Sequence, residues 1–399
     1  HGFLAKHSTA SNLLECLHDW IIALESSELV DAVYIDFSRA FDSVVHAKLL
    51  HKLQSVGIAG KLYNWIAEFL TDRSQCTVIA NVFSSFRNVL SGVIQGSCLG
   101  PLLFLIFIND IDAIVDADGS CKMFADDLKL YSSYCKESTN STIQSMLDNL
   151  QAWSVKWQLS INHSKCKVLH LDSSRVNCIH TDYYINGVKL PSDNCVNDLG
   201  VLIDNLRYKE HIGNICSKAY SRIALLFRGF ISRDASILVR AYKVYIRPVL
   251  EYCSIIWSPW QIGLINAVES VQRYFTRRLI WPKVLPYNER LAVLELETLQ
   301  LRRLKFDMYY CYKILNNLTC INKDLYFVND NRDLNIRNYD KYRLQYNPSS
   351  SCRCSNHFFN RCVDIWNSLP LKARTASSLN VFKLLLNSHD FTRHLKGRA

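Results

Sequence analysis

Three aspartates lie where predicted strands end, a setting in which carboxylates can bind divalent cations. Asp36 follows a short β-rich run, and Asp126 and Asp127 lie between two apolar runs that predict a tight hairpin. We expect all three to converge at one sheet edge, although 90 residues separate the two segments. Carboxylates this close together raise one another's pKa unless a cation neutralises their charge. Mg²⁺ prefers carboxylate oxygens as ligands. Two Mg²⁺ ions held there would support in-line phosphoryl transfer.

An adjacent pair of aspartates can also be ordinary turn chemistry, because Asp favours turns and solvated loops. Taken alone, Asp126-Asp127 fits that interpretation. The context favours a metal site, since Phe124 and Leu128 flank the pair within apolar strands and a second strand ends at Asp36. A solvated loop requires neither feature.

Helices and strands alternate around these aspartates. Ser8 and Thr9 are N-cap candidates for an opening helix, and Pro101 begins an apolar helix that continues to Ile108. The other expected elements are helices over 45–56 and 59–70, a hairpin around Ala80-Asn81, a helix ending at Trp157, and strands over 167–171 and 199–203.

From about residue 211 the pattern becomes mostly helical, and one predicted helix carries a basic ridge. Its apolar face holds Leu238, Ala241, Tyr242 and Tyr245, and its basic face holds Arg233, Arg240, Lys243 and Arg247. Such a ridge can bind phosphates or be a solvated face. Further basic residues occur at Lys218, Arg222, Arg228, Arg273, Arg277, Arg278, Arg302 and Arg303.

The two halves of the chain differ in charge. Residues 1–210 hold 17 Lys and Arg against 23 Asp and Glu, whereas residues 211–399 hold 29 against 13. This asymmetry suggests carboxylate chemistry attached to a surface that binds a polyanion, of which nucleic acid is the obvious example. It favours phosphate contact over a solvated face for the basic ridge.

Size and composition are those of a folded protein with two or three subdomains. The chain has 399 residues, of which 49% are hydrophobic and 21% charged. Its 15 cysteines are scattered singly, which indicates a reducing compartment, and no apolar run reaches the roughly 18 residues of a membrane span. We therefore expect a soluble protein with no membrane partner. Because the chain opens with His1, we expect a fragment that lacks an amino-terminal part.

Three segments, in this order, resemble the polymerase motifs of non-LTR (LINE-like, jockey-type) retrotransposon reverse transcriptases. VYIDFSRAFD at 33–42 resembles motif A, SGVIQGS at 91–97 resembles motif B, and FADD at 124–127 resembles motif C. The resemblance continues through His1-Gly2-Phe3, through a motif D-like segment at 161–165, and through later segments at 199–201, 211–212, 245–252 and 366–370. It covers nearly the whole chain.

The resemblance implies that Asp36, Asp126 and Asp127 bind metal. Asp127 could instead orient the other ligands, because the second Asp of motif C often contributes less directly than the first. The backbone carbonyl of Phe37 is a further candidate ligand. The implied cofactors are two Mg²⁺ ions, which Mn²⁺ could replace.

The resemblance also implies residues that contact the incoming nucleotide. Phe41 matches a steric gate that excludes the 2′-hydroxyl of a ribonucleotide, or it is an ordinary core phenylalanine. Gln95 and Gly96 match residues that pack against the nucleotide and the template base. Ile94 stands where the family usually has proline, which loosens the loop and removes no chemical group.

A lysine could protonate the departing pyrophosphate. Lys165 matches that role in motif D, and Lys167 competes for it. A solvated surface lysine is the alternative for either residue, because charged side chains are mostly exposed.

The implied fold class is α+β, with the right-hand architecture of polymerases. We expect fingers and palm over 1–205, a helical thumb over 206–260 and a mostly helical carboxyl-terminal extension over 261–399. Cys352, Cys354, His357 and Cys362 also suggest a zinc knuckle, but the first two cysteines are too close for a structural zinc site.

The implied activity is RNA-directed DNA polymerisation: transfer of dNTPs onto a primer 3′-hydroxyl on an RNA template, with DNA as the primer or target. The location would be intracellular and nuclear, with element RNA in the cytoplasm. A catalytically incompetent, polymerase-derived fragment that binds nucleic acid is the alternative. A two-metal nuclease shares the carboxylates but leaves Phe41, Gln95 and Gly96 unexplained.

Overall fold

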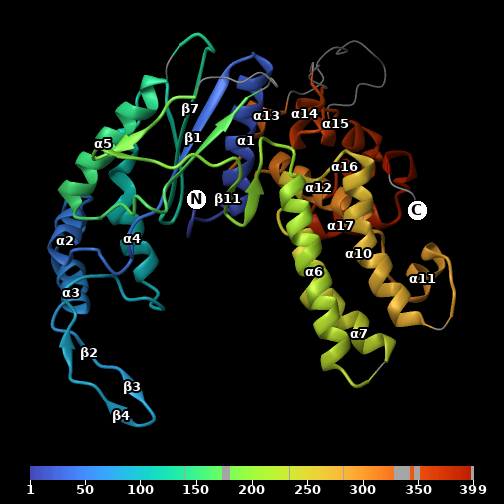
Figure 1. The fold of residues 1–399 in the computed structure, drawn as a ribbon, viewed down its shortest axis with the longest axis horizontal. Coiled ribbons are helices and arrows are strands. Elements are labelled where there is room, and N and C mark those ends of the chain that lie inside the picture. Colours follow the sequence, from blue (N-terminus) through green and yellow to red (C-terminus); the bar gives the residue numbers. More distant parts are fainter. Residues whose placement is uncertain are drawn as a thin grey trace. The chain divides into compact units, whose positions relative to one another are not determined.

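The computed structural model describes residues 1–138, 140–172, 180–232, 234–281, 283–327, 342–345 and 351–396. Its contacts divide the chain into two compact units. Unit 1 comprises His1–His7 and Ser26–Asn194, and unit 2 comprises Ser8–Glu25 and Cys195–Ala399. Unit 1 combines a sheet with helices, and unit 2 is mainly helical, which confirms the expected α+β class (Figure 1).

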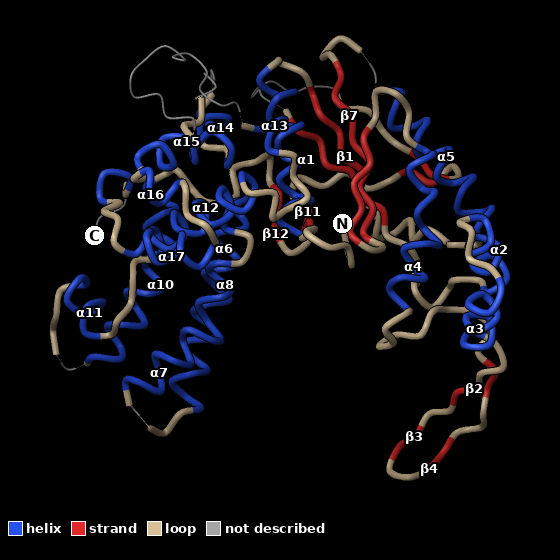
Figure 2. The backbone as a smooth tube through the Cα atoms, turned by 180° about the vertical axis from the view of Figure 1, so that it is seen from behind, coloured by secondary structure: helices blue, strands red, loops and turns tan. Residues whose placement is uncertain are grey.

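The central element of unit 1 is an antiparallel sheet in the strand order β6-β7-β1-β8, drawn red in Figure 2. Its strands are β1 (Leu29–Ile35), β6 (Ser120–Phe124), β7 (Asp127–Tyr134) and β8 (Lys167–Leu171). β1 lies between β7 and β8, with Ile35 opposite Leu128 and Tyr34 opposite Lys167. The end of β1 therefore lies beside the start of β7.

The sheet forms because its central strand is apolar along nearly its whole length. All of β1 except Tyr34 is buried, as expected for a strand covered on both faces. Helix α5 (Ser141–Trp157) packs against β7 and buries Leu147 and Leu150. Each such leucine stabilises the fold by roughly 1.5–3 kcal/mol. The Asn140 side chain begins this helix by accepting a hydrogen bond from the Ile143 N–H.

The predicted helices of unit 1 are confirmed to within one residue at each end. They are α2 (His46–Ser55), α3 (Gly60–Leu70) and α4 (Gly100–Ile108), followed by the 3₁₀-helix η1 (Asn109–Ile114). Helix α4 buries Phe104 and Phe107 completely, which explains its lack of an amphipathic pattern. Two further strands, β9 (Tyr184–Ile185) and β10 (Val188–Lys189), form a short hairpin.

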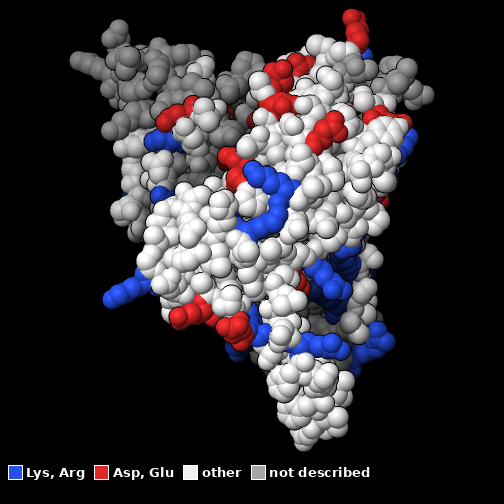
Figure 3. All heavy atoms as spheres, turned by 90° about the vertical axis from the view of Figure 1, so that its left-hand side faces the viewer, with Lys and Arg blue, Asp and Glu red and all other residues white. Residues whose placement is uncertain are grey.

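A narrow arm follows α3, in which the chain runs out and back and forms two short antiparallel ladders. Its strands are β2 (Ser74–Gln75), β3 (Val78–Ile79), β4 (Val82–Phe83) and β5 (Arg87–Asn88), with β2 paired to β5 and β3 to β4. Ala80 and Asn81 have φ of 45° and 67°, so the hairpin turn predicted there is confirmed. The tip carries no charged residue from Ser74 to Phe86, and Figure 3 shows it as the uncharged projection at the lower end.

Unit 2 is built mainly from helices. The longer ones are α1 (Thr9–Glu25), α6 (Lys209–Gly229), α10 (Ile262–Ile280), α12 (Leu299–Leu315) and α15 (Phe358–Ser368). The shorter ones are α7 (Ala235–Ala241), α8 (Arg247–Glu251), α9 (Ser254–Trp257), α11 (Tyr287–Val293), α13 (Lys323–Tyr326), α14 (Cys352–Ser355), α16 (Leu371–Arg374), α17 (Leu379–Asn387) and the 3₁₀-helix η3 (Thr392–His394). Within the described residues, no helix is both long and apolar enough to cross a membrane.

Packing within unit 2 centres on two helices. α6 packs against α10, and α12 contacts α9, α10, α15 and α17. α1 contacts α9 and α14, which is why Ser8–Glu25 belong to this unit. A hairpin of β11 (Val196–Asp198) and β12 (Val201–Ile203) precedes α6, so the strand predicted over 199–203 begins two residues later than expected.

A buried ion pair joins α12 to α15. Arg361 donates through Nε and Nη2 to the two oxygens of Asp307, at 2.9 and 2.8 Å. Burial alone would raise the pKa of Asp307 and lower that of Arg361, and each charge offsets that effect on the other. Removing either partner would leave an uncompensated buried charge, at a cost of about 3–5 kcal/mol.

The helix expected to carry the basic ridge is interrupted. α7 continues into a π-helical turn, η2 (Tyr242–Ile246), before α8 resumes at Arg247. Pro248 explains this, because it has no N–H to donate to the Val244 carbonyl and its ring would collide with that carbonyl in a regular α-helix. The wider turn breaks the predicted periodicity. The other three members of the apolar face are buried, but Tyr245 is 63% exposed, so its placement there was wrong.

Candidate active site

The three predicted carboxylates lie at one edge of the unit 1 sheet. Asp36 is the first residue after β1, and Asp126 and Asp127 lie at the β6–β7 hairpin. Phe124 pairs with Asp127, so the turn residues are Ala125 and Asp126. The predicted turn was displaced by one residue, and Asp127 begins β7 instead. Ala125 has the left-handed backbone (φ 55°) that a two-residue hairpin turn requires.

The strand register explains why these residues come together. Because Ile35 is opposite Leu128, the next residue, Asp36, continues opposite Asp127, and directly opposed residues share a face of the sheet. Asp126 is the neighbouring turn residue. In the part of the chain that is described, the side-chain oxygens of the three aspartates do not all lie within 4.8 Å of one another. The backbone brings the carboxylates to one edge, where like charges repel one another unless a cation neutralises them.

Asp36 has an oxygen that a cation would stabilise. Its Oδ2 is buried and has no hydrogen-bond partner among the described residues. The Nζ of Lys165 lies 3.5 Å away, an ion-pair distance that is long for a hydrogen bond. Lys167, the other candidate cation, is paired with Asp193 at 2.7 Å. A buried carboxylate oxygen without a hydrogen bond is unfavourable, and a divalent cation is the ligand that would satisfy it.

A bridge between Phe37 and Ile161 fixes the backbone beyond Asp36. The Asn162 N–H donates to the Asp36 carbonyl at 2.8 Å. On the other side of the bridge, the Ser38 N–H donates to the Ser160 carbonyl, also at 2.8 Å. In an antiparallel pair flanked in this way, the paired residues point their own N–H and C=O groups away from each other. The Phe37 carbonyl therefore points toward the β7 side, where the hairpin aspartates lie.

A buried thiol lies beside this backbone. The Cys166 Sγ donates to the Asn162 carbonyl at 3.3 Å. Burial raises the pKa of Cys166 and outweighs a hydrogen bond to the Asp36 backbone, which lowers it, while the Asp36 charge adds a smaller increase. The thiol therefore stays protonated and adds no negative charge to the carboxylate cluster.

Gly2 packs directly against the hairpin turn. A Cβ built at Gly2 would lie 2.7 Å from the Ala125 nitrogen, which is closer than real contacts allow. Only glycine therefore fits beside this turn. The sequence marked this segment solely through its resemblance to the family, and the contact supplies the physical reason for glycine.

Phe41 lies between the core and the surface. Its ring stacks on Phe104, with centroids 4.1 Å apart and planes 18° apart, and Phe3 meets it edge-on at 6.3 Å. The side chain is only partly buried. One face therefore rests on the core and the ring keeps an exposed part, an arrangement compatible with both interpretations of this residue.

The loop resembling motif B is bound to the end of motif A. The Gln95 Nε2 donates to Asp42 Oδ1 at 2.8 Å, and the Ser91 hydroxyl donates to the Asp42 carbonyl at 2.9 Å. These contacts hold Gln95 against Asp42, six residues after Asp36 in the chain. Asp42 was not predicted as a site residue, and its position as the last residue of motif A was the available signal.

Two glycines shape this loop in different ways. Gly92 has φ +93°, and a Cβ there would lie 2.9 Å from the Cα and the carbonyl oxygen of Asp42. Gly96 has φ +84° and nothing within 4 Å of its added Cβ. Gly92 thus permits close backbone packing, whereas Gly96 leaves open space at the exposed tip, where the resemblance expects nucleotide and template.

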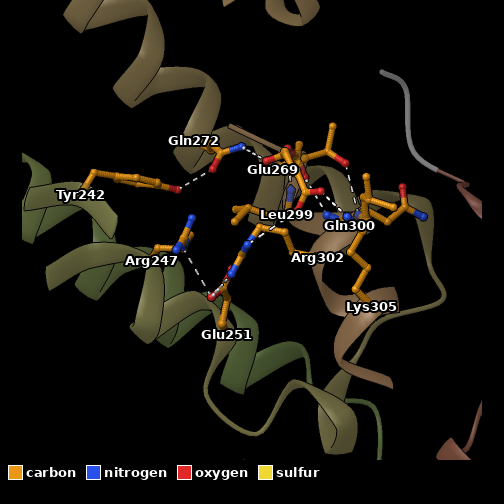
Figure 4. A network of polar contacts seen from close by, with 12 residues as sticks. Tyr242, Arg247, Glu251, Glu269, Gln272, Leu299, Gln300, Arg302 and Lys305 are labelled. Carbon is orange, nitrogen blue, oxygen red and sulfur yellow. Dashed lines mark hydrogen bonds and ion pairs between the residues drawn. The ribbon is translucent and has the colours of Figure 1, made fainter. Parts of the chain in front are cut away.

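The predicted phosphate-binding residues of unit 2 lie in different surroundings. Arg240 is exposed on α7, and Lys243 is half-buried on the π-helical turn. Arg247 turns inward, with its Nε 3.6 Å from Glu251, a carboxylate that a second arginine also contacts (Figure 4). Burial and that second arginine lower the pKa of Arg247. Arg233 lies outside the described residues.

The cysteine-rich segment near the carboxyl end is part of the unit 2 core. Cys362 is buried, and His357 packs against Phe359 with ring centroids 5.5 Å apart. Burial lowers the pKa of His357 well below its usual value. Over the described ranges, Cys352, Cys354, His357 and Cys362 form no group that could hold one metal ion.

The three motifs that meet at the sheet edge fall within one matched family segment. The profile described as "Reverse transcriptase (RNA-dependent DNA polymerase)" matches residues 4–203, about half of the chain. The chain belongs to the reverse transcriptase family. Its α+β fold is that of reverse-transcriptase-like polymerases, and family membership implies dependence on a divalent metal ion.

Curated relatives of this reverse transcriptase chain are polymerases of mobile elements. It is 28% identical over 291 residues to the "RNA-directed DNA polymerase from mobile element jockey" of Drosophila funebris, covering 70% of this chain and 31% of that protein. It is 27% identical over 284 residues to the "Probable RNA-directed DNA polymerase from transposon X-element" of Drosophila melanogaster, covering 69% and 31%. These matches confirm the resemblance to non-LTR retrotransposon reverse transcriptases. The chain spans about a third of the length of these relatives.

Solved structures that are similar to this chain include telomerases. Telomerase from Candida albicans in complex with a fragment of telomeric RNA matches 74% of this chain and 54% of that chain, at 12% identity and a TM-score of 0.39. A score this low gives no residue correspondence.

The residues at the sheet edge fit a divalent metal ion. Asp36, Asp126 and Asp127 supply hard carboxylate oxygens, and within the described part of the chain the Asp36 Oδ2 has no hydrogen-bond partner. A metal ion bound there would neutralise phosphate charge and make a hydroxyl more acidic. The chain's own contribution is to hold the carboxylates at one edge of the sheet and to place Lys165 beside Asp36.

Proposed function

We propose that this chain is the polymerising part of a non-LTR retrotransposon reverse transcriptase. It adds dNTPs to a primer 3′-hydroxyl on an RNA template, with DNA as the primer or target. The new bond joins the 3′-oxygen to the α-phosphorus, and the bond that breaks releases pyrophosphate. Asp36, Asp126 and Asp127 hold two Mg²⁺ ions, which Mn²⁺ can replace.

The observation that carries this proposal is the meeting of motif A with motif C. The strand register brings Asp36 beside Asp127 across two neighbouring strands. Gln95 is bound to Asp42 of motif A at 2.8 Å, which adds motif B to the same neighbourhood. A nuclease would need the carboxylates, but it would have no use for an aromatic gate and a nucleotide-facing glutamine.

Several residues take roles within this proposal. Lys165 donates the proton to the departing pyrophosphate, as its position beside Asp36 supports. Phe41 blocks the 2′-hydroxyl of a ribonucleotide, and Gln95 and Gly96 contact the nucleotide and the template base. Phe37 offers its backbone carbonyl.

The proposed domain organisation follows the same assignment. Fingers and palm occupy 1–205, the thumb occupies 206–260 and the extension occupies 261–399. Arg240, Lys243 and Arg247 of the thumb contact phosphates of the template and primer. The proposed location is intracellular and nuclear, because elements of this kind prime on chromosomal DNA.

The test separates synthesis from binding. Asp36→Ala should abolish nucleotide addition on a primed RNA template with Mg²⁺ and leave affinity for RNA nearly unchanged, because the carboxylate contributes little to RNA binding. Asp182→Ala, which removes an exposed carboxylate paired with Lys189, is the matched control. Equal rates of synthesis by the Asp36→Ala variant and the unaltered chain would sink the assignment.

A further inference from the structure

A cavity of about 590 Å³ lies within unit 2. Its walls come from residues 243–255, from α12 and from α17, with Ala10 contributing from α1. The volume is within the range of roughly 300–1,000 Å³ typical of ligand sites. The carboxylates at the sheet edge take no part in it.

Positive charge predominates in this cavity. The basic side chains that line it are Lys243, Arg247, Lys313 and Lys383, and the carboxylate is Glu251. Glu251 is already engaged, because Arg302 Nη2 donates to its Oε2 at 3.1 Å and Arg247 lies 3.6 Å from that oxygen (Figure 4).

The three lysines of the cavity have no compensating charge. Across the described ranges, no carboxylate forms an ion pair with Lys243, Lys313 or Lys383. Like charges gathered in one concave site repel one another, and an anion between them removes that cost. The cavity therefore favours a ligand with more than one negative charge.

Aromatic rings lie among these cations. Phe306 and Tyr309 line the cavity from α12, and Tyr252, which is 45% exposed, lines it from the other side. The Nζ of Lys383 lies 5.4 Å from the centroid of the Tyr309 ring. A ring bordered by cations suits a nucleotide, because a base can stack on the ring while its phosphates contact the lysines.

The π-helical turn η2 forms part of the wall. Lys243 belongs to this turn, and Pro248, which causes it, also lines the cavity. A regular helix would have kept Tyr245 on the apolar face predicted from the sequence, whereas the observed turn exposes it. Turns of this kind occur frequently at functional sites.

We propose that this cavity binds a nucleotide of a single-stranded nucleic acid, with its base stacked on Tyr309 and its flanking phosphates on Lys243, Lys313 and Lys383. The inference rests on the proposed function for its ligand class, because a reverse transcriptase makes nucleic acid the expected polyanion. It gives the extension a role: α12 and α17 hold a single-stranded stretch of the template, primer or target that lies beyond the paired duplex. RNA and DNA share the required chemistry.

The first test removes charge from the cavity. Binding of a short unstructured oligonucleotide, as RNA and as DNA, is measured by fluorescence anisotropy on the full chain in EDTA without nucleotides. The double variant Lys313→Ala, Lys383→Ala should bind at least about 10-fold more weakly, and its salt slope should be smaller by about 1.4, since each phosphate contact on a single strand contributes roughly 0.7. The control, Lys209→Ala with Lys372→Ala, removes two exposed lysines outside the cavity.

The result that overturns the proposal is equal loss of affinity in the two double variants. Both are expected to unfold at the same temperature as the unaltered chain, because the described structure gives none of these lysines an ion pair. A larger loss on RNA than on DNA assigns the strand to the template, and the reverse assigns it to the primer or target.

The second test addresses stacking. Tyr309→Leu should weaken binding of the normal DNA oligonucleotide by roughly 5- to 150-fold, whereas Tyr309→Phe, which keeps the ring, should not. Neither variant should change binding of an oligonucleotide whose bases are replaced by abasic residues. A loss from Tyr309→Leu that is equal on normal and abasic DNA contradicts stacking and overturns the proposal.

Primer extension by the same variants separates this inference from the proposed function. If the variants show the expected binding pattern but the unaltered chain extends no primer, the polymerase assignment is contradicted and the nucleotide site in the cavity is supported. If the unaltered chain extends primers but the variants lack the binding pattern, the polymerase assignment is supported and the nucleotide site in the cavity is contradicted.

Discussion

The Nζ of Lys165 lies 3.5 Å from the Oδ2 of Asp36, whereas Lys167 is paired with Asp193 at 2.7 Å. The local backbone explains the difference between two lysines that are only two residues apart. Lys165 belongs to the turn after Asn162, to whose carbonyl its N–H donates at 3.0 Å, while Lys167 is the first residue of β8. Of the two candidates named from the sequence, Lys165 is the one beside a predicted metal ligand.

We predict that Lys165→Ala lowers the rate of nucleotide addition by about 100-fold, the lower end of what general acid catalysis contributes. Lys167→Ala should leave the rate within about 2-fold, because it removes only a partly exposed ion pair worth at most about 1 kcal/mol. Single-nucleotide incorporation on a primed RNA template, at saturating dNTP, measures both. Equal rates for the two variants would remove Lys165 from the mechanism.

Phe41 allows a test of sugar selection. Phe41→Ala removes the ring that would meet a 2′-hydroxyl, and we expect the preference for dNTP over rNTP to fall by at least about 10-fold, the size of one lost steric or apolar discrimination. Phe41→Tyr keeps the ring and should keep the preference. Incorporation of paired dNTP and rNTP is measured for each variant. If Phe41 is an ordinary core residue, Phe41→Ala lowers stability through lost stacking on Phe104 and leaves the preference unchanged.

Gly92→Ala tests the contact between motifs A and B. The added Cβ would lie 2.9 Å from Asp42 backbone atoms at a φ of +93°, so both strain and a clash oppose it. We expect a loss of roughly 1–3 kcal/mol of stability and at least a 10-fold fall in activity, because Gln95 loses its position. Thermal unfolding and primer extension measure the two effects.

The control for Gly92 is Gly187→Ala. Its φ is +73°, but its added Cβ meets nothing within 4 Å. Gly187→Ala should cost only the backbone strain and leave activity intact. Loss of activity in both variants, in proportion to stability, would show that Gly92 matters for folding alone.

His211 makes the stability of unit 2 depend on pH. Its Nδ1 accepts a hydrogen bond from the Leu202 N–H at 3.1 Å, its buried Nε2 has no hydrogen-bond partner among the described residues, and burial lowers its pKa from 6.5 to about 4. The unfolded chain therefore binds a proton between pH 6.5 and 4 that the folded chain does not. Stability is complete above pH 6.5 and falls as the pH drops toward 4, by about 2 kcal/mol at pH 4.5 from this residue.

Substitution of His211 should remove that dependence. Between pH 7 and pH 4.5, the free energy of unfolding of His211→Gln should fall by about 2 kcal/mol less than that of the unaltered chain, as measured by urea denaturation. Burial also lowers the pKa of His18 to about 4, so part of the dependence should persist. An identical pH dependence in the variant would mean that the pKa of His211 is the same in the folded and the unfolded chain.

Much of unit 1 could be predicted because its local signals agree with its tertiary structure. β1 is mostly apolar and ends at Ile35, directly before Asp36, and α4 begins beside Pro101 as expected. The hairpin was displaced by one residue because Ala125, rather than an aspartate, takes the left-handed position in a turn against which Gly2 packs. A contact that spans more than a hundred residues leaves no periodicity to read.

The remaining features depended on contacts that periodicity does not record. The π-helical turn caused by Pro248 breaks the helical spacing from which Tyr245 was placed on the buried face. Arg247 turns toward Glu251, a carboxylate that Arg302 of α12 also contacts. This pairing depends on how the helices of unit 2 pack. Charge balance predicted a basic surface, but it could not identify which basic side chains are already paired with carboxylates.

The measurement that tests the central claim most directly is primer extension on an RNA template with dNTPs and Mg²⁺. It compares the unaltered chain with the double variant Asp126→Asn, Asp127→Asn and with Asp182→Asn, an exposed carboxylate outside the sheet edge. We predict extension by the unaltered chain and the Asp182→Asn control, and loss of at least about 1,000-fold in the double variant, which removes two carboxylates of the proposed metal site. Extension by the double variant at the rate of the control would contradict the central claim.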